Sequence, residues 1–331
     1  MTSASPDYRF FGAYRLMLAW LVMTSHSANH LASWVTPLAL GNVGVFAFFV
    51  LSGFVIAEAC DRFYPGAPQR FLANRLLRIY PTYWVACALA LAIYIPLGHP
   101  ELRLDASSVL GNLAILYARP GTFFWLSLIW AVGIELRFYF VAALMNAALR
   151  VFHARRGLVF TLFGAGALAL YLITTASDFS RLATFRHAPF FMLGMTAYYA
   201  IARSSRRAAL AATATLPFAL HSYFLYNAPG PAPAVTTALF ALALGLMTLA
   251  AYARVSAHTA RIDKVLGDLT YPLYLVHWPM VYLVDRLFPW KGLASYGAIA
   301  AASLSTAAAV LLIEQPITRL RDKVRRRRLY G

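Results

Sequence analysis

Apolar runs of about twenty residues recur along the whole chain, and they constrain the fold more than any other feature of the sequence. A helix that crosses a hydrocarbon core about 30 Å thick needs roughly 17 to 25 such residues. Runs of this length favour helices, because the strands of a membrane barrel would alternate apolar and polar residues over about ten positions. Ten runs qualify, at residues 11–30, 41–60, 79–97, 122–148, 158–175, 187–202, 208–226, 235–253, 269–287 and 293–313. The sequence therefore predicts an all-α, polytopic membrane bundle of about ten transmembrane helices.

The composition excludes a soluble globular protein. Hydrophobic residues make up 61% of the chain and charged residues 12%, whereas soluble domains carry about 25% charged residues. No stretch is long and polar enough for a separate domain, so residues 1–331 form one integral-membrane domain. The two cysteines, Cys60 and Cys87, lie in or beside apolar runs, and we expect neither a disulfide framework nor a metal site.

The basic residues predict the orientation in the membrane. The net charge is +17, but its distribution along the chain indicates topology rather than a nucleic-acid partner. In a ten-span arrangement, 22 of the 29 Lys and Arg residues lie on the side of the two termini, including those of a basic tail at 317–331. By the positive-inside rule both termini are cytoplasmic, and the tail is expected to contact anionic membrane lipids.

Arg15 and His26 open the first span, and a polar residue at this depth is a functional candidate. Eleven residues of helix place both side chains on one face, about 16 Å apart along the axis. One interpretation makes Arg15 a topology charge and His26 a structural histidine. The other makes His26 a general base, because a pKa near 6.5 leaves imidazole largely neutral at pH 7.

Further ionisable residues lie within or beside the third and fourth spans. Glu135 lies two positions before Arg137, and a carboxylate at this depth must be protonated or paired. It could pair with Arg137, or it could orient His26. Arg75 and Arg78 share a helical face near Arg70 and can contact phosphate oxygens in a bidentate manner. The alternative for Glu135 is a purely structural ion pair, and the alternative for the three arginines is a role as positive-inside topology charges.

Three polar side chains within apolar spans are candidates for contact with a substrate. Ser52 lies on the second span beside Gly53 and has no nucleophile-elbow motif around it, so we do not expect it to attack a substrate. The small residues of this span either allow close helix packing or line a narrow tunnel for an acyl or pantetheine chain. His277 follows Tyr274 by one turn in the ninth span. This pair either binds an acceptor or packs in the core.

Six short motifs, in a fixed order, carry a family resemblance. They are Y-R-L-M-L-A-W-L-V-M-T-S-H at 14–26, G-N-V-G-V-F-A-F-F-V-L-S-G-F-V-I at 41–56, R-F-L-A-N-R-L-L-R-I-Y-P-T-Y-W at 70–84, L-S-L-I-W-A-V-G-I-E-L-R-F-Y at 126–139, T-Y-P-L-Y-L-V-H-W-P at 270–279 and I-E-Q-P at 313–316. The fourth departs from the family pattern in its spacing. Together they resemble the membrane-bound acyltransferase-3 family, whose members O-acylate sugars and related acceptors.

The resemblance implies an O-acyltransferase of a bacterial inner membrane. The donor would be acyl-coenzyme A, with acetyl the commonest group, and the acceptor a glycan or glycolipid hydroxyl. The implied roles are catalysis by His26, Glu135 and Arg15, donor binding by Arg70, Arg75, Arg78 and Tyr80, and substrate binding by His277, Tyr274, Ser52 and Arg137. His26 would act as a base or as a covalent acyl relay. A secondary transporter or flippase of a lipid-linked sugar is the alternative, although the chain lacks the two matching halves typical of transporters.

Overall fold

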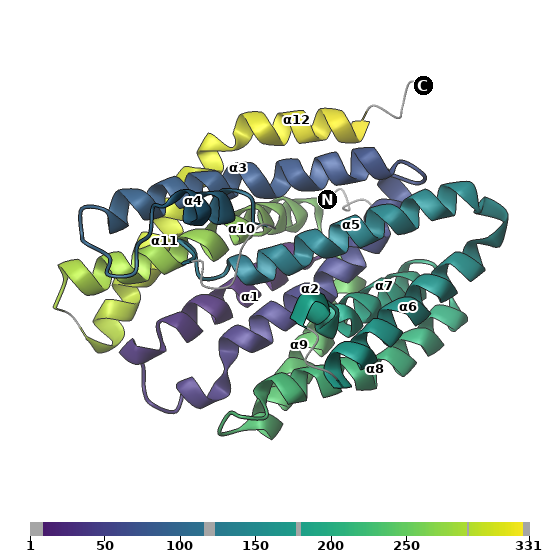
Figure 1. Cartoon of the computed structure of the whole chain (residues 1–331), viewed down its shortest axis with the longest axis horizontal. Coiled ribbons are helices and arrows are strands. Elements are labelled where there is room, and N and C mark those ends of the chain that lie inside the picture. Colours follow the sequence, from purple (N-terminus) through teal and green to yellow (C-terminus); the bar gives the residue numbers. More distant parts are fainter. Residues whose placement is uncertain (1–8, 116–122, 177–179, 290, 327–331) are drawn as a thin grey trace. The chain divides into compact units, whose positions relative to one another are not determined.

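The chain is helical throughout its described parts, in agreement with the predicted all-α class. The computed structural model describes residues 9–115, 123–176, 180–289 and 291–326 (Figure 1). Within these residues there are twelve α-helices and no β-strand. The last five residues of the predicted basic tail, 327–331, lie outside the described residues.

Each predicted span has a corresponding helix. The ten helices, in chain order, are α1 (Phe11–His26), α2 (Leu40–Glu58), α3 (Pro68–Tyr94), α5 (Ile129–Val151), α6 (Arg156–Ala176), α7 (Ala188–Ala202), α8 (Arg206–Asn227), α9 (Pro233–Tyr252), α10 (Ala257–Leu287) and α11 (Gly292–Ile313). Two shorter helices, α4 (Ala106–Leu113) and α12 (Gln315–Arg326), complete the described fold.

Seven helical segments among the described residues are long and apolar enough to cross a membrane. They contain α2, α3, α5, α6, α8, α9 and α11. The other three predicted spans correspond to α1 and α7, with 16 and 15 residues, and to α10, which carries charged residues in its first half. The protein is therefore a multi-pass membrane protein, while the number of ten crossings and the side of the termini remain predictions.

The chain divides into two compact units, which are described separately below. The first contains Met1–Val45, Arg78–Gly133 and Ala238–Arg319, and the second contains Phe46–Leu77, Ile134–Thr237 and Leu320–Gly331.

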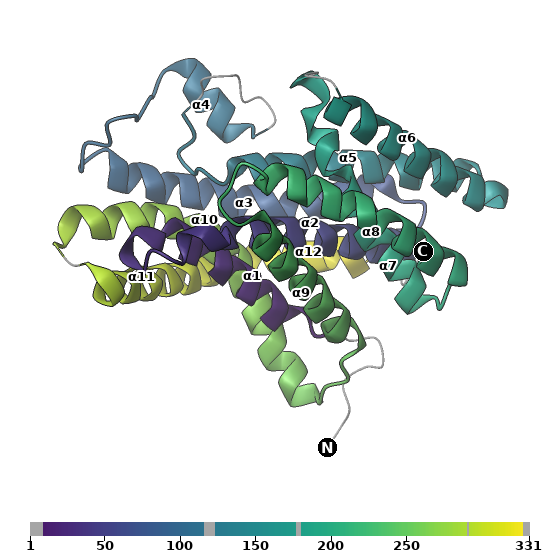
Figure 2. The same cartoon turned by 90° about the horizontal axis from the view of Figure 1, so that it is seen from below.

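In the first unit, α1 and α10 run parallel and in register (Figure 2). The buried carboxylate of Asp263 accepts hydrogen bonds from the backbone N–H groups of Gly12 at 2.8 Å and Ala13 at 2.6 Å. It thereby caps the first turn of α1, which has no local side-chain cap. Gly12 is required there, because a Cβ at this position would overlap the Asp263 carbonyl. Further along, His26 meets His277, so the same separation of 251 positions holds at both ends of the contact.

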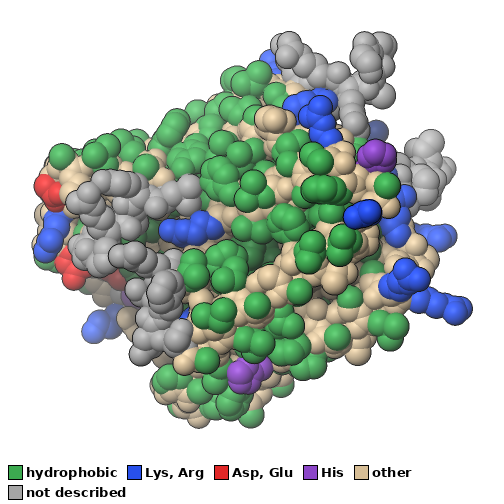
Figure 3. Space-filling model, turned by 45° about the vertical axis from the view of Figure 1, so that its right-hand side comes forward, with side chains coloured by type: hydrophobic (Ala, Val, Ile, Leu, Met, Phe, Trp, Pro, Cys, Tyr) green, Lys and Arg blue, Asp and Glu red, His purple; other side chains and the backbone are tan. Residues whose placement is uncertain are grey.

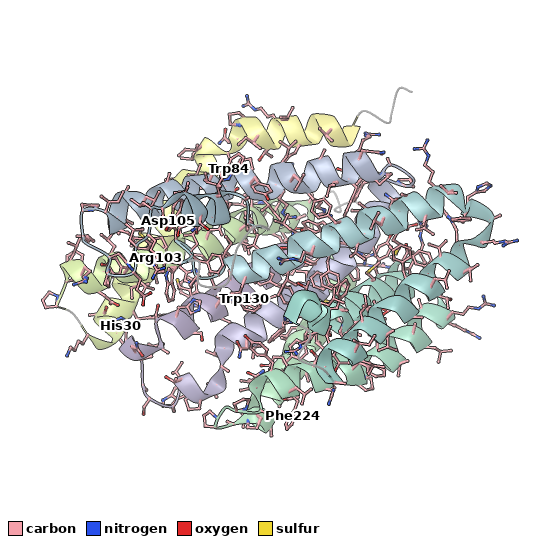
Figure 4. The ribbon with its side chains drawn as sticks, in the orientation of Figure 1. His30, Trp84, Arg103, Asp105, Trp130 and Phe224 are labelled. Carbon is pink, nitrogen blue, oxygen red and sulfur yellow. The ribbon has the colours of Figure 1, made fainter. Side chains whose placement is uncertain are left out.

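The parallel direction agrees with the sequence-based topology, in which the first and ninth spans cross the membrane the same way. Beyond α1, His30 (Figure 4) continues the contact between these segments, with its Nε2 atom 2.9 Å from a carboxylate oxygen of Asp285. The N-terminus of α1 and the residues after its C-terminus are therefore both tied to α10.

The α4 segment belongs to the first unit and is held at both ends (Figure 4). Asp105 caps its N-terminus, accepting from the backbone N–H of Ser108 at 3.0 Å. Three aromatic side chains of α3 donate to carbonyl oxygens at its C-terminal end: Tyr83 to Asn112, Trp84 to Leu113 and Tyr80 to Ala114. The hydroxyl group of Tyr80, which the sequence predicts to bind the donor, therefore holds the end of α4.

In the second unit, α2 and α7 pack closely through glycines. A Cβ on Gly53 would overlap the backbone of Phe191, and a Cβ on Gly194 would overlap the backbone of Val50. The phenylalanines around these glycines stack on one another, including Phe49 on Phe191. Of the two interpretations of the small residues on the second span, close helix packing accounts for Gly53.

Candidate active site

The most distinctive polar contact of the first unit joins His26, the last residue of α1, to His277 of α10. The Nδ1 atom of His26 lies 2.9 Å from the Nε2 atom of His277, and the two rings are nearly parallel. His277 is fully buried, whereas His26 is half-buried. The rings of Trp278 and His26 are nearly perpendicular, with 4.9 Å between centroids. Two histidines on facing helices thus form a hydrogen-bonded pair, and only His26 of this pair is accessible.

The hydrogen bonds determine where the protons lie. The Nδ1 atom of His277 is 3.2 Å from the carbonyl oxygen of Leu273, one turn earlier in α10. A carbonyl oxygen only accepts, so this Nδ1 carries the proton, and in a neutral ring Nε2 is then the acceptor. The Nδ1 atom of His26 must therefore be the donor to His277.

This order leaves a lone pair on the Nε2 atom of His26. Within the described part of the chain, that Nε2 makes no hydrogen bond. A neutral imidazole whose tautomer is set by a partner, with an accessible unprotonated nitrogen, is the form that a general base or a nucleophile requires.

Other sequence candidates of the first unit lie at different distances from this pair. Tyr274 is buried one turn before His277, and its ring meets the His277 ring edge-on with 6.3 Å between centroids. Arg15 is half-buried about 16 Å from His26 along α1. The guanidinium of Arg15 lies beside Gly267 of α10, and a Cβ at that position would still be 3.9 Å from its Nη1 atom.

A second polar cluster, in the second unit, surrounds Glu135 of α5. Its Oε1 atom accepts hydrogen bonds from the hydroxyl of Ser52, at 2.7 Å, and from the hydroxyl of Tyr139. Arg137 is exposed and lies on another face of α5, as expected for two residues that are not a helical turn apart. The carboxylate is thus held by two hydroxyl groups rather than by Arg137.

Arg75 of α3 is buried beside this cluster. Its guanidinium lies over the rings of Phe71 and Tyr139, 5.4 Å from each centroid, and donates to the carbonyl oxygen of Val55 at 3.3 Å. Only 6% of the residue is exposed, which differs from the surface position that the positive-inside pattern predicts. A planar, weakly hydrated guanidinium stacks on aromatic faces at little cost, and this accounts for its burial.

The neighbouring arginines are placed differently. Arg70 donates to the carbonyl oxygen of Val324 in α12 at 2.8 Å, so part of its guanidinium is engaged by the C-terminal helix. Arg78 is partly exposed and belongs to the first unit. Among the residues that the structure describes, no group of three or more His, Cys, Asp or Glu side chains is arranged to hold a metal ion.

Three contributors to these clusters were missed by the sequence analysis. In the sequence, Trp278 and Tyr139 stand only as members of motifs, and Asp263 belongs to none of the motifs. Asp263 lies before the ninth predicted span, among Arg261, Lys264 and Asp268. Nothing in this charged stretch of sequence indicates that its carboxylate caps another helix. The roles of Trp278 and Tyr139 depend on which helix each one faces.

Comparison with known proteins decides between the candidate classes. The family model of acyltransferase-3, described as an acyltransferase domain, matches residues 9–314. The chain belongs to the acyltransferase-3 family. It is a membrane acyltransferase, and the resemblance carried by the six motifs is confirmed.

Two curated relatives cover nearly the full length of this family member. The exopolysaccharide production protein ExoZ of Rhizobium meliloti (strain 1021) is 26% identical over 298 residues, which is 87% of this chain and 92% of ExoZ. Nodulation protein 10 of Rhizobium leguminosarum bv. viciae is 25% identical over 376 aligned positions, covering 96% of this chain and 95% of that protein. No solved structure matches the chain.

Proposed function

We propose that this acyltransferase moves an acyl group, most simply acetyl, from acyl-coenzyme A to a hydroxyl group of a glycan in a bacterial inner membrane. The single observation that carries the mechanism is the hydrogen-bonded series His26, His277 and the Leu273 carbonyl. The printed name of ExoZ supports a polysaccharide acceptor, since that relative acts in exopolysaccharide production.

His26 is the general base in this proposal. Its Nε2 atom takes the proton of the acceptor hydroxyl as the oxygen attacks the thioester carbonyl, and the C–S bond then breaks. The same nitrogen returns the proton to the departing thiolate, so that an ester and a thiol result. While His26 holds this proton, His277 stabilises the positive charge, because its Nε2 atom accepts the hydrogen bond from the His26 imidazolium.

A covalent acyl-histidine relay would use the same lone pair. Rapid acid quench of the enzyme with a radiolabelled donor and no acceptor separates the two mechanisms. Label that remains on the wild-type protein but not on a His26→Ala variant would indicate the covalent relay. No label on the wild-type protein would support general-base catalysis by His26.

The donor is assigned to Arg75 and Arg78. Support comes from the buried Arg75 guanidinium, whose Nε makes no hydrogen bond within the described residues, and from the partial exposure of Arg78. Guanidinium groups bind phosphate oxygens in a bidentate fork. Replacement of both by Ala is therefore expected to raise the KM for acyl-coenzyme A more than that for the acceptor. Glu135 keeps the catalytic role predicted for it, with its Oε1 atom held by the hydroxyl groups of Ser52 and Tyr139.

The experiment that tests the function compares wild-type protein with His26→Ala. Membranes that contain either protein are supplied with acetyl-coenzyme A, and surface glycans are analysed for O-acetyl groups by mass spectrometry. We expect a loss of at least a hundredfold in transfer at normal membrane abundance, as is typical when a general base is removed. Transfer above a tenth of the wild-type rate in a well-expressed variant would remove His26 from the mechanism.

His30→Ala is the matched control, because it changes a nearby histidine that is engaged by Asp285 rather than by His277. Its transfer rate is expected to stay near that of wild type. Glycans that carry no O-acetyl groups in the wild type would contradict the proposed acceptor.

A further inference from the structure

A cavity of about 750 Å³ lies among α5, α6, α7 and α8 of the second unit. Its walls are mainly apolar and rich in phenylalanine and methionine, including Phe138, Phe163 and Met195. Gly164 of α6 lines the cavity, and a Cβ at this position would meet only the end of Met192, at 3.9 Å, so the position faces open space. The volume lies within the range of about 300 to 1,000 Å³ that is typical of ligand pockets.

The cavity has the depth of one membrane leaflet. Its lining residues on α6 run from Gly157 to Ala167, and ten residues of helix rise about 15 Å. This is half of a hydrocarbon core about 30 Å thick. The acyl chains of one leaflet match this depth, whereas a long polyprenyl chain exceeds it.

The end of the cavity near Gly157 adjoins a smaller, polar cavity. This second space, of about 210 Å³, shares Phe160 and Tyr199 with the first. Arg150, His153 and Arg156 line it. Figure 3 shows Lys and Arg side chains gathered beside a largely hydrophobic surface, the arrangement expected where a membrane surface meets its core.

The charges at this end favour an anion. Arg150 and Arg156 line the polar cavity, and Arg207 lines the apolar cavity. Within the described residues, none of the three guanidinium groups has a hydrogen-bonded or ion-paired partner. The carboxylate in the polar cavity, Asp61, is already engaged by Arg203 at 2.7 Å. Three cations thus remain for an external anion, and arginine binds phosphate oxygens well.

We propose that the two cavities form one binding site for an anionic diacyl phospholipid. Its acyl chains would occupy the space among the four helices, and its phosphate would contact Arg150, Arg156 and Arg207. These arginines lie in segments that the sequence predicts to be cytoplasmic, where basic pockets between transmembrane helices bind anionic lipid head groups. The site takes no part in the proposed acyl transfer and goes beyond it.

Native mass spectrometry of the full-length protein in detergent tests this proposal. Phosphatidylglycerol, phosphatidylcholine and a polyprenyl phosphate are the probes, each titrated separately. Wild-type protein is expected to retain one phosphatidylglycerol in preference to phosphatidylcholine. The double variant Arg156→Gln with Arg207→Gln should weaken phosphatidylglycerol binding about thirtyfold, because each arginine near a lipid head group contributes roughly a factor of five.

Two matched controls separate the site from general effects. Arg206→Gln removes a neighbouring exposed charge that lines neither cavity, and it should leave binding unchanged. Gly164→Leu should fill the apolar cavity and displace the lipid, whereas Gly166→Leu, on an open face of α6, should not.

Three results would overturn the proposal. They are equal retention of phosphatidylglycerol by wild type and by the arginine double variant, equal retention of phosphatidylcholine and phosphatidylglycerol by wild type, and tighter retention of the polyprenyl phosphate than of phosphatidylglycerol. Because the arginines are exposed and unpaired within the described residues, the double variant is expected to fold.

Discussion

At the scale of single residues, the chemistry of His26 depends on its neighbour. An isolated imidazole in water exchanges between its two tautomers, and only one of them has its lone pair on Nε2. The hydrogen bond to His277, itself held by the Leu273 carbonyl, selects that tautomer. His277 is therefore assigned a positioning role rather than the substrate contact that the sequence predicts for it.

Substitution of His277 tests this role. His277→Ala should lower kcat about tenfold to a hundredfold with little change in KM, because His26 loses its orienting acceptor while the substrate contacts remain. His277→Gln should restore part of the rate, since its amide oxygen can accept the same hydrogen bond. Steady-state kinetics with both substrates checks this. A large rise in the acceptor KM with unchanged kcat would instead return His277 to substrate binding.

The charge of Glu135 can be separated from its hydrogen bonds. Ser52 and Tyr139 both donate to Oε1, an atom that Glu135→Gln retains as an amide oxygen. This variant is therefore expected to reach the membrane at normal abundance, yet to lose at least tenfold in acyl transfer because the carboxylate charge is gone. Tyr139→Phe, which removes one donor, is the control for packing. A fully active Glu135→Gln protein would show that the cluster is structural.

At the scale of helices, the site depends on the register between α1 and α10. Asp263 holds the N-terminus of α1 at one end of the contact, and the histidine pair forms fourteen residues further along, a rise of about 21 Å. A helix is stiff over this length, so the cap at one end helps to determine the position of His26 at the other.

Removal of this cap should weaken the whole contact. Asp263→Ala leaves two backbone N–H groups without an acceptor and should destabilise the protein by about 1 to 3 kcal/mol. A lower melting temperature in detergent and reduced activity are the expected measurements. Asp268→Ala, at an exposed position that faces Lys264, is the matched control and should change little. An unchanged melting temperature for Asp263→Ala would contradict this account of the register.

At the scale of the whole molecule, the proposed topology makes a prediction about sidedness. Trp34 follows α1 and is 67% exposed, while His153 is exposed between α5 and α6. In intact cells, a membrane-impermeant maleimide should label Trp34→Cys from outside and should label His153→Cys only after the membrane is opened. The native cysteines, Cys60 and Cys87, are buried and give little background. Labelling of both positions, or only of 153, in intact cells would contradict the ten-span topology.

The same cysteine tests the route of the acceptor. If the acceptor reaches His26 from outside, a bulky adduct at position 34 should block acyl transfer while binding of acyl-coenzyme A is kept. An adduct that abolished donor binding and spared acceptor binding would reverse the proposed direction of entry.

The sequence by itself determined the membrane class, the helices and the family. Apolar runs of membrane length are local properties of the chain, and each of the ten predicted spans coincides with a helix. His26 could be singled out for the same reason, because a polar residue in an apolar run stands out without any partner. The six motifs added the family, which the comparison confirms.

The tertiary structure alone decided which side chains meet. His26 and Gly12 each have a partner 251 positions away, and no periodicity in the sequence indicates that distance. From the sequence, Glu135 could equally have paired with Arg137, but helix packing places Glu135 against Ser52. Arg75 could likewise have remained at a membrane surface, but helix packing buries it against the ring of Tyr139. A hydrogen bond and a buried charge depend on the facing helix, and helix packing brings together residues from distant parts of the chain.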